Sequence, residues 1–185
     1  MIKNIFITTL ITLAVSVTSF AGADEKRAKI DAMSAKAITT LYNEEPSAED
    51  QIKDSYGYAT FSNIGVNVIL LSAGGGKGVA VNNKSGARTY MKMASAGVGL
   101  GLGVKDFRAV FIFHTQDAFN SFVNKGWDFS GQADAAAKSG KKGGEKSGAV
   151  DIGDGVTVYQ MTKTGLALQA TLQGTKYWKS KKLNK

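Results

Sequence analysis

The chain of 185 residues contains no cysteine and only one histidine. The absence of cysteine excludes disulfide bonds, a thiol nucleophile and the acylated cysteine that anchors bacterial lipoproteins. A single histidine, His114, cannot build a multi-histidine metal site. No serine lies in the Gly-x-Ser-x-Gly pattern of a nucleophile elbow. We therefore expect a protein that binds a partner and is not an enzyme, and that needs no metal or other cofactor.

The first residues have the features of a signal peptide. Lys3 provides a positive start, and residues 5–17 are almost wholly apolar or hydroxylic. This run is shorter than the roughly 20 residues of a membrane-spanning helix, and small residues suited to cleavage after Ala21 or Ala23 follow it. We therefore predict that residues 1–23 are a signal peptide and that the chain is exported to the periplasm or secreted.

Basic residues outnumber acidic residues in this chain. Lys and Arg total 23 and Asp and Glu total 15, which gives a net charge of +8. A positive surface favours anionic partners. Outside the cytoplasm these are anionic lipid headgroups or other polyanions, and no nucleic acid partner is expected. Charge that serves only solubility is the alternative explanation.

Apolar spacing divides the rest of the chain into a helical start and a strand-rich body. Apolar residues recur every three or four positions over residues 24–42, which predicts an amphipathic helix, and a short second helix follows up to residue 55. Period-two alternation over residues 56–61 predicts that strands then dominate. The strand at residues 107–113 is apolar on both faces and should be central. Other strands are expected at residues 66–71, 79–82, 87–93, 127–129, 156–162 and 166–172.

One further helix interrupts the strands. Thr115 or Asp117 can cap a helix that carries Phe119 and Phe122, and Gly126 is placed to end it. The predicted fold is therefore α+β: an N-terminal amphipathic helix plus a curved or sandwich-like antiparallel β-sheet with one inserted helix. Its core is expected to contain Phe61, Leu70, Val98, Leu100, Phe111, Phe113, Phe119, Val158 and Leu168.

Several segments rich in glycine or polar residues suggest loops or special strands. Glycine alternates with apolar residues over residues 97–103, which predicts a strand with one bare face that a helix, another sheet or a ligand covers. Residues 138–148 are rich in Lys, Gly and Ser and predict a mobile loop. Residues 74–78 lack the spacing of a phosphate-binding loop and indicate a turn. Asp151 and Asp154 lack the pattern of a calcium loop and also indicate turn chemistry.

Short segments spread along the chain resemble one known family in their order and spacing. They are YGYATFSN at residues 56–63, GGGKGV at 74–79, ASAGVGLG at 94–101, VFIF at 110–113 and GTKY at 174–177. Together they resemble the SYLF domain, a lipid-binding module, over nearly all of residues 50–178. The resemblance implies binding without catalysis to anionic phospholipid, because eukaryotic relatives associate with phosphoinositide membranes. The yeast actin-binding relatives also bundle actin, but we do not expect actin as a partner of an exported protein.

A single domain is expected at residues 24–185, with a helical lead-in at 24–55, a sheet-rich core at 56–174 and a basic tail at 175–185. Lysines are predicted to contact phosphate headgroups while Trp178 or the apolar face of the first helix enters the interface. The alternative is a structural or interaction module that docks a protein partner, or a second copy of itself, through its glycine-rich sheet. The candidate lipid-binding residues are Lys26, Arg27, Lys29, Lys138, Lys141, Lys142, Lys146, Lys176, Trp178, Lys179, Lys181 and Lys182.

Overall fold

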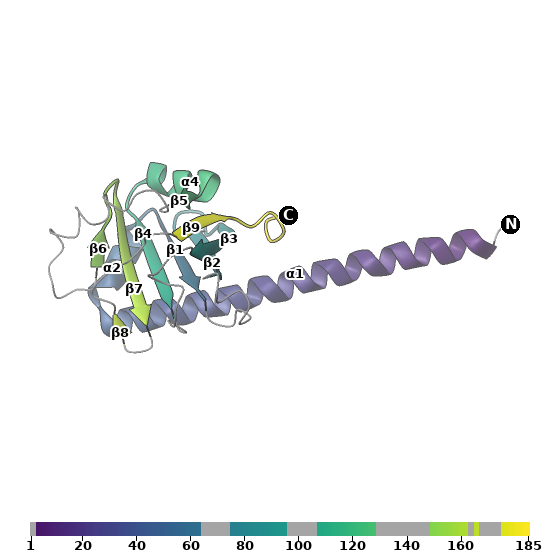
Figure 1. Cartoon of the computed structure of the whole chain (residues 1–185), viewed down its shortest axis with the longest axis horizontal. Coiled ribbons are helices and arrows are strands. Elements are labelled where there is room, and N and C mark those ends of the chain that lie inside the picture. The colour runs from purple at the N-terminus through teal and green to yellow at the C-terminus, as the bar shows by residue number, and fades with distance from the viewer. Residues whose placement is uncertain (1–2, 64–74, 96–106, 129–148, 163–164, 167–174) are drawn as a thin grey trace.

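A computed structural model describes residues 3–63, 75–95, 107–128, 149–162, 165–166 and 175–185. The described helices are α1 (Lys3–Glu44), α2 (Ser47–Asp54) and α4 (Gln116–Lys125). The described strands are β1 (Gly57–Ser62), β2 (Gly76–Asn82), β3 (Arg88–Ser95), β4 (Arg108–Phe113), β5 (Trp127–Asp128), β6 (Ala149–Asp151), β7 (Val156–Thr162), β8 (Gly165–Leu166) and β9 (Thr175–Lys179). Figure 1 shows the long helix α1 along one side of the strands and α4 on the other side.

All described strands belong to one antiparallel sheet. Their order is β5-β9-β3-β2-β1-β4-β7-β6, with β8 paired to β7. The sheet is curled, so the curved alternative is confirmed and the described strands do not form a two-sheet sandwich. Strand β4 lies inside the sheet with β1 on one side and β7 on the other, as the apolar pattern of residues 107–113 predicts. The α+β class is therefore confirmed, and among the described residues helix α4 is the one inserted between strands.

Helix α1 is longer than the apolar pattern predicts. It begins at Lys3 and ends at Glu44, where Pro46 prevents its continuation. Its buried residues after position 22 recur at helical spacing, which brings them to the face that packs on the sheet. They are Ala23, Ile30, Ser34, Ala37 and Leu41. The amphipathic helix predicted over residues 24–42 is confirmed as the part of α1 that covers the sheet. No described helix combines the length and apolar character needed to cross a membrane.

Local end signals fix helix α4 as predicted. The Thr115 hydroxyl oxygen accepts a hydrogen bond from the Ala118 N–H at 3.3 Å, so Thr115 and not Asp117 caps the helix. Gly126 ends it with φ of 73°, a left-handed conformation that glycine adopts without the clash of a Cβ. Helix α4 therefore starts and stops where short-range chemistry requires.

Alternate strand residues divide the core between two faces of the sheet. The aromatic face carries Phe61, Phe111 and Phe113, which pack against Phe119 and Phe122 of α4. The helix face packs under α1 and α2. Its buried strand residues are Val79, Val81, Tyr90, Val110, Ile112, Tyr159 and Met161. Each central strand therefore contributes side chains to two hydrophobic layers, one under α4 and one under α1 and α2.

The predicted core is confirmed for Phe61, Phe111, Phe113, Phe119 and Val158, which are all buried. The other predicted core residues, Leu70, Val98, Leu100 and Leu168, lie outside the described residues. So do the strand predicted at residues 66–71, the glycine alternation at 97–103 and the loop at 138–148.

The C-terminal residues belong to the fold. Strand β9 pairs with β3 on one side and β5 on the other. Tyr177 is 1% exposed in the aromatic face, and Leu183 is 7% exposed beneath α1. The sheet therefore continues past residue 174, although the lysines that follow predict a basic tail from residue 175. The reason is that Thr175 and Tyr177 alternate with outward residues, as a half-buried strand requires.

Candidate cationic binding surface

Strand register places basic residues from separate strands side by side. Ser62 of β1 pairs with Arg108 of β4 on one side and with Lys77 of β2 on the other. Lys77 pairs with Lys92 of β3, which in turn pairs with Trp178 of β9. Directly paired residues of antiparallel strands project to the same face, with Cβ atoms about 4.5–5.5 Å apart. We call Arg108, Lys77, Lys92 and Trp178 the cationic row.

The cationic row borders helix α1. Val79 and Tyr90, two residues along the strands from Lys77 and Lys92, are buried in the cluster that packs against α1. The row therefore lies on the helix face of the sheet. Lys77 and Lys92 are nevertheless exposed, and Arg108 and Trp178 are half-buried. Helix α1 thus covers the apolar neighbours and leaves the row open.

The two flanks of helix α1 carry different contacts. Asp31 accepts hydrogen bonds from Arg88 Nη1 at 2.8 Å and from the Tyr90 hydroxyl at 2.9 Å. Arg88 is the first residue of β3 and lies four residues before Lys92, so this flank of α1 faces away from the cationic row. At about 100° per residue, Lys26 and Lys29 project from the other flank, on the side of the row. Both lysines are exposed.

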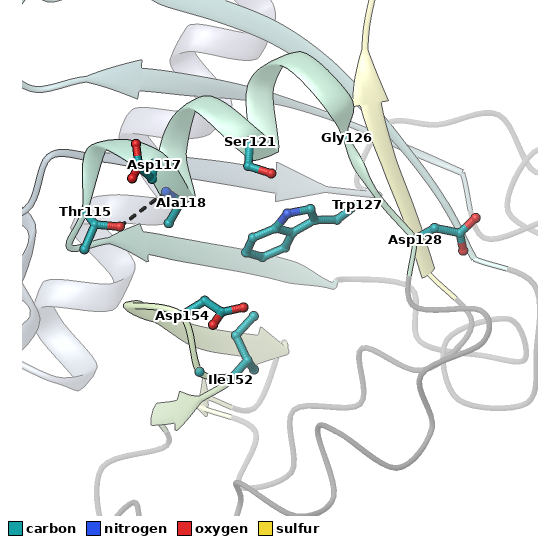
Figure 2. A pocket seen from close by; sticks show the side chains of 10 residues that line it. Thr115, Asp117, Ala118, Ser121, Gly126, Trp127, Asp128, Ile152 and Asp154 are labelled. Atoms are coloured by element: carbon teal, nitrogen blue, oxygen red, sulfur yellow. Dashed lines mark hydrogen bonds between the residues drawn. The ribbon is translucent and has the colours of Figure 1, made fainter.

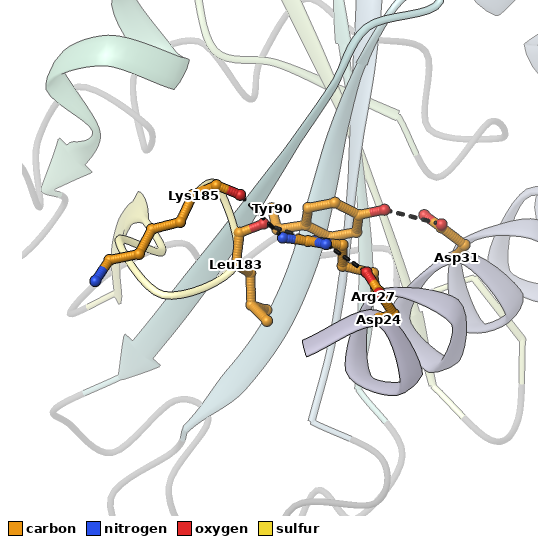
Figure 3. A network of polar contacts seen from close by, with 6 residues as sticks. All are labelled: Asp24, Arg27, Asp31, Tyr90, Leu183 and Lys185. Atoms are coloured by element: carbon orange, nitrogen blue, oxygen red, sulfur yellow. Dashed lines mark hydrogen bonds and ion pairs between the residues drawn. The ribbon is translucent and has the colours of Figure 1, made fainter. Parts of the chain in front are cut away.

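Contacts within α1 differ between its candidate basic residues. The Lys29 Nζ is 2.6 Å from the Glu25 carboxylate, and both side chains are mostly exposed. Arg27 is held by the C-terminal segment: its Nε donates to the Leu183 carbonyl at 3.0 Å and its Nη2 to the Lys185 carbonyl at 3.2 Å (Figure 3). Arg27 therefore joins α1 to the C-terminal segment.

The C-terminal candidates do not gather at one place. Trp178 belongs to the cationic row, and Lys176 projects to the same face, with its Nζ 3.0 Å from the Asp128 carboxylate. Lys179 pairs with Met91 of the aromatic face, so it projects to the other side of the sheet. Lys181 and Lys182 are exposed beyond the strand. The remaining candidates, Lys138, Lys141, Lys142 and Lys146, lie outside the described residues.

Two comparisons connect this architecture with known proteins. The family model Ysc84, described as "Las17-binding protein actin regulator", matches residues 94–185. The chain is also 37% identical over 161 residues to Beta cell expansion factor A of Aeromonas veronii. The chain belongs to the SYLF (Ysc84) family. The match covers 87% of this SYLF chain, which spans 60% of the length of that relative.

Three members of the cationic row in this SYLF chain are not among the residues predicted from sequence. Lys77, Lys92 and Arg108 are isolated basic residues in separate strands, whereas the candidates named from sequence come in clusters. Their side chains share one face of the sheet only because of the register between strands that are far apart in the chain. The available signal was a basic residue within a mostly apolar strand, which marks an open position.

Other polar groups of the SYLF fold have structural partners. His114 Nε2 is 2.9 Å from the Thr157 hydroxyl. The Asp151 carboxylate accepts from the Gly153 N–H at 2.8 Å, which confirms turn chemistry there. Burial raises the pKa of the Tyr177 hydroxyl far above its ordinary value. Within the described part of the chain, no three His, Asp or Glu side chains lie close enough together to hold a metal ion.

Proposed function

We propose that this SYLF domain binds the surface of anionic phospholipid bilayers as a peripheral, non-catalytic protein. The observation that supports the proposal best is the alignment of Arg108, Lys77 and Lys92 beside Trp178 on one face. Each basic residue near an anionic membrane contributes on the order of 1 kcal/mol. Three such residues already stand on ordered strands. Binding therefore loses less free energy to ordering the backbone than it would with a flexible segment.

The tryptophan adds an apolar contribution to the same surface. Trp178 is half-buried, and the strand that carries it is paired on both edges. An indole fixed beside cations suits the boundary between headgroups and acyl chains, where tryptophan is enriched. Lys26 and Lys29 on the neighbouring flank of α1 extend the positive surface. The proposed mechanism is therefore electrostatic attraction to phosphate groups, followed by shallow contact of Trp178 with the interface.

Cosedimentation with vesicles tests this proposal. The protein of residues 22–185 is mixed with vesicles that contain or lack phosphatidylglycerol, at low and at high salt. The variant Lys77→Gln/Lys92→Gln is compared with Lys84→Gln/Lys125→Gln, which removes two exposed lysines elsewhere, in the β2–β3 turn and at the end of α4. We expect the first variant to bind up to about 30-fold more weakly and the second to bind nearly as well as the unmodified protein.

The outcomes of this experiment separate the surface from net charge. Equal losses in the two variants would show that any two lysines matter alike, and the cationic row would then not be the site. Failure to sediment with anionic vesicles at low salt would overturn the lipid proposal. Binding that falls as salt rises is expected, because exposed charges are screened within about 10 Å at 0.1 M salt.

A protein partner is the second candidate function. The matched family model is described as Las17-binding, and the relative is named for expansion of beta cells. Those names suggest action on or through other proteins, and self-association belongs to the same class. An interface driven by apolar contacts should persist at high salt, whereas headgroup binding through lysines should not. Binding to a partner that survives high salt, without any vesicle binding, would favour this candidate.

Export belongs to the same proposal, and the fold favours one of the two cleavage positions. Ala23 is 8% exposed and packs in a cluster with Ile30, Val79 and Leu183. Cleavage after Ala21 retains this contact, and cleavage after Ala23 removes it. N-terminal sequencing of protein recovered from the periplasm or medium should therefore read Gly22 first. A sequence that starts at Asp24, or retention of residues 1–21, would contradict this expectation.

A further inference from the structure

The aromatic face of the sheet borders a pocket that the proposed lipid surface does not use. The pocket measures about 580 Å³, a size typical of small-molecule sites. It lies between the start of α4, strand β5 and the turn that joins β6 to β7. Its lining residues are Thr115, Asp117, Ala118, Ser121, Gly126, Trp127, Asp128, Ile152, Gly153 and Asp154.

All charged residues of the described lining are acidic. Asp117, Asp128 and Asp154 line the pocket, and none of its described lining residues is a lysine, arginine or histidine. This is the reverse of the whole chain, whose net charge is +8. Asp128 is also paired with Lys176 at 3.0 Å, so Asp117 and Asp154 supply most of the negative charge. The pocket is therefore a local negative site that favours a cation.

An aromatic ring lies at the centre of this negative site. Figure 2 shows the Trp127 indole in the middle of the pocket, with Asp117 and Asp128 toward opposite sides and Ile152 near the ring. The core holds the indole in place, because its centroid is 4.9 Å from that of Phe122 and 5.8 Å from that of Phe113. A fixed tryptophan ring attracts organic cations through its π face and also packs against methylene groups.

The arrangement suits an organic cation better than a metal ion. A metal needs several ligand atoms at about 2.0–2.6 Å from one point. Among the described residues, no three acidic side chains lie close enough for that. Carboxylates set apart around an apolar ring instead match separate ammonium groups joined by an aliphatic chain.

We propose that this pocket binds an aliphatic diamine or polyamine. The methylene chain lies against Trp127 and Ile152, one ammonium group contacts Asp117, and another contacts Asp154. Trp127 pairs with Tyr177 of the aromatic face, so the pocket and the cationic row lie on opposite faces of the sheet. The two proposals are therefore independent, and either can fail without the other.

Titration with spermidine tests the pocket. The chain contains two tryptophans, so Trp178→Phe leaves Trp127 as the only indole and its fluorescence reports on the pocket. We expect saturable binding by calorimetry, accompanied by a change in Trp127 emission. Asp117→Asn and Asp154→Asn should each weaken spermidine binding about two- to fivefold. Asparagine tolerates the left-handed φ of 53° at position 154, so the second variant should keep the fold.

The matched control is Asp54→Asn, which removes an exposed carboxylate from α2 on the other side of the sheet. It should bind spermidine like the unmodified chain, and all three Asn variants should keep their vesicle binding. The chain as a whole is positive, so its overall charge does not attract the spermidine cation. Saturable binding would therefore report a specific site on the chain. Absence of saturation, equal affinity in Asp117→Asn and Asp54→Asn, or equal competition by Mg²⁺ would overturn the polyamine site.

Discussion

The aromatic face and the helix face of the sheet are held by different physical means. On the aromatic face, ring centroids of Phe61, Phe111, Phe122 and Tyr177 lie 4.7–6.0 Å apart, in edge, tilted or stacked arrangements. On the helix face, aliphatic residues pack with Tyr90 and Tyr159 against α1 and α2, and the hydrogen bonds of Arg27 join α1 to the C-terminal segment. We therefore expect the aromatic face to supply more of the stability than the helix face does.

A glycine shows how closely the aromatic face is packed. A Cβ built at Gly78 would overlap the Phe61 ring and the Thr60 carbonyl. The ring thus occupies the space that any other residue at position 78 would fill. The packing around Phe61 therefore leaves no room for a side chain at position 78.

The largest expected effect comes from the centre of the aromatic face. Phe111 is fully buried and contacts five other rings. Phe111→Ala should lower the free energy of unfolding by about 3–5 kcal/mol, because it removes a large apolar side chain and leaves a cavity. Chemical denaturation measures this change.

The neighbouring residue on the same strand provides the comparison. Ile112 is equally buried but projects to the helix face. Ile112→Ala removes fewer atoms and should cost less than Phe111→Ala, within about 2–5 kcal/mol. If Ile112→Ala costs more, the helix face carries the greater share of stability and the ranking of the two faces is wrong.

Local patterns predicted most elements of both faces. The helix over residues 24–42, the Thr115 cap and the glycine stop at position 126 depend on residues a few positions apart, which sequence shows directly. The central strand at residues 107–113 follows from its continuous apolar run. These features did not require knowledge of which strands pair.

The candidate site was harder to predict because it depends on register. Lys77, Lys92 and Arg108 meet only when β2, β3 and β4 are aligned, and a shift of one residue would send their side chains to the opposite face. The basic residues after position 174 conceal a strand in which Thr175 and Tyr177 point inward. Clusters of charge in the sequence therefore identified Trp178 and missed its neighbours in space.

A smaller loss of stability is expected at Arg27, whose polar contacts join α1 to the C-terminal segment. Arg27 donates hydrogen bonds to the carbonyls of Leu183 and Lys185 (Figure 3), and its side chain is 26% exposed. Arg27→Ala should lower the free energy of unfolding by about 1–2 kcal/mol, because charge-assisted hydrogen bonds and stem packing are lost.

Hydrogen exchange locates the Arg27 effect. Amides of the C-terminal segment, such as Leu183 N–H, should exchange faster in Arg27→Ala. The exchange of β4 amides should change only as much as the global free energy of unfolding changes. Lys26→Ala on the opposite flank serves as the control, since that side chain is exposed. If both variants leave the exchange of Leu183 unchanged, Arg27 does not fasten this segment to α1.

The smallest effect, and one of opposite sign, is expected at Thr60. Its side chain is fully buried on the helix face between Val79 and Val110, and its hydroxyl has no hydrogen-bond partner among the described residues. Thr60→Val replaces that hydroxyl with a methyl group of similar size, so it should raise the free energy of unfolding by up to about 1 kcal/mol. The corresponding change Ser62→Ala is less informative because Ser62 has a polar interaction. A loss of stability in Thr60→Val, measured by denaturation, would mean that the hydroxyl is satisfied in solution and that the helix face is more polar than its aliphatic neighbours indicate.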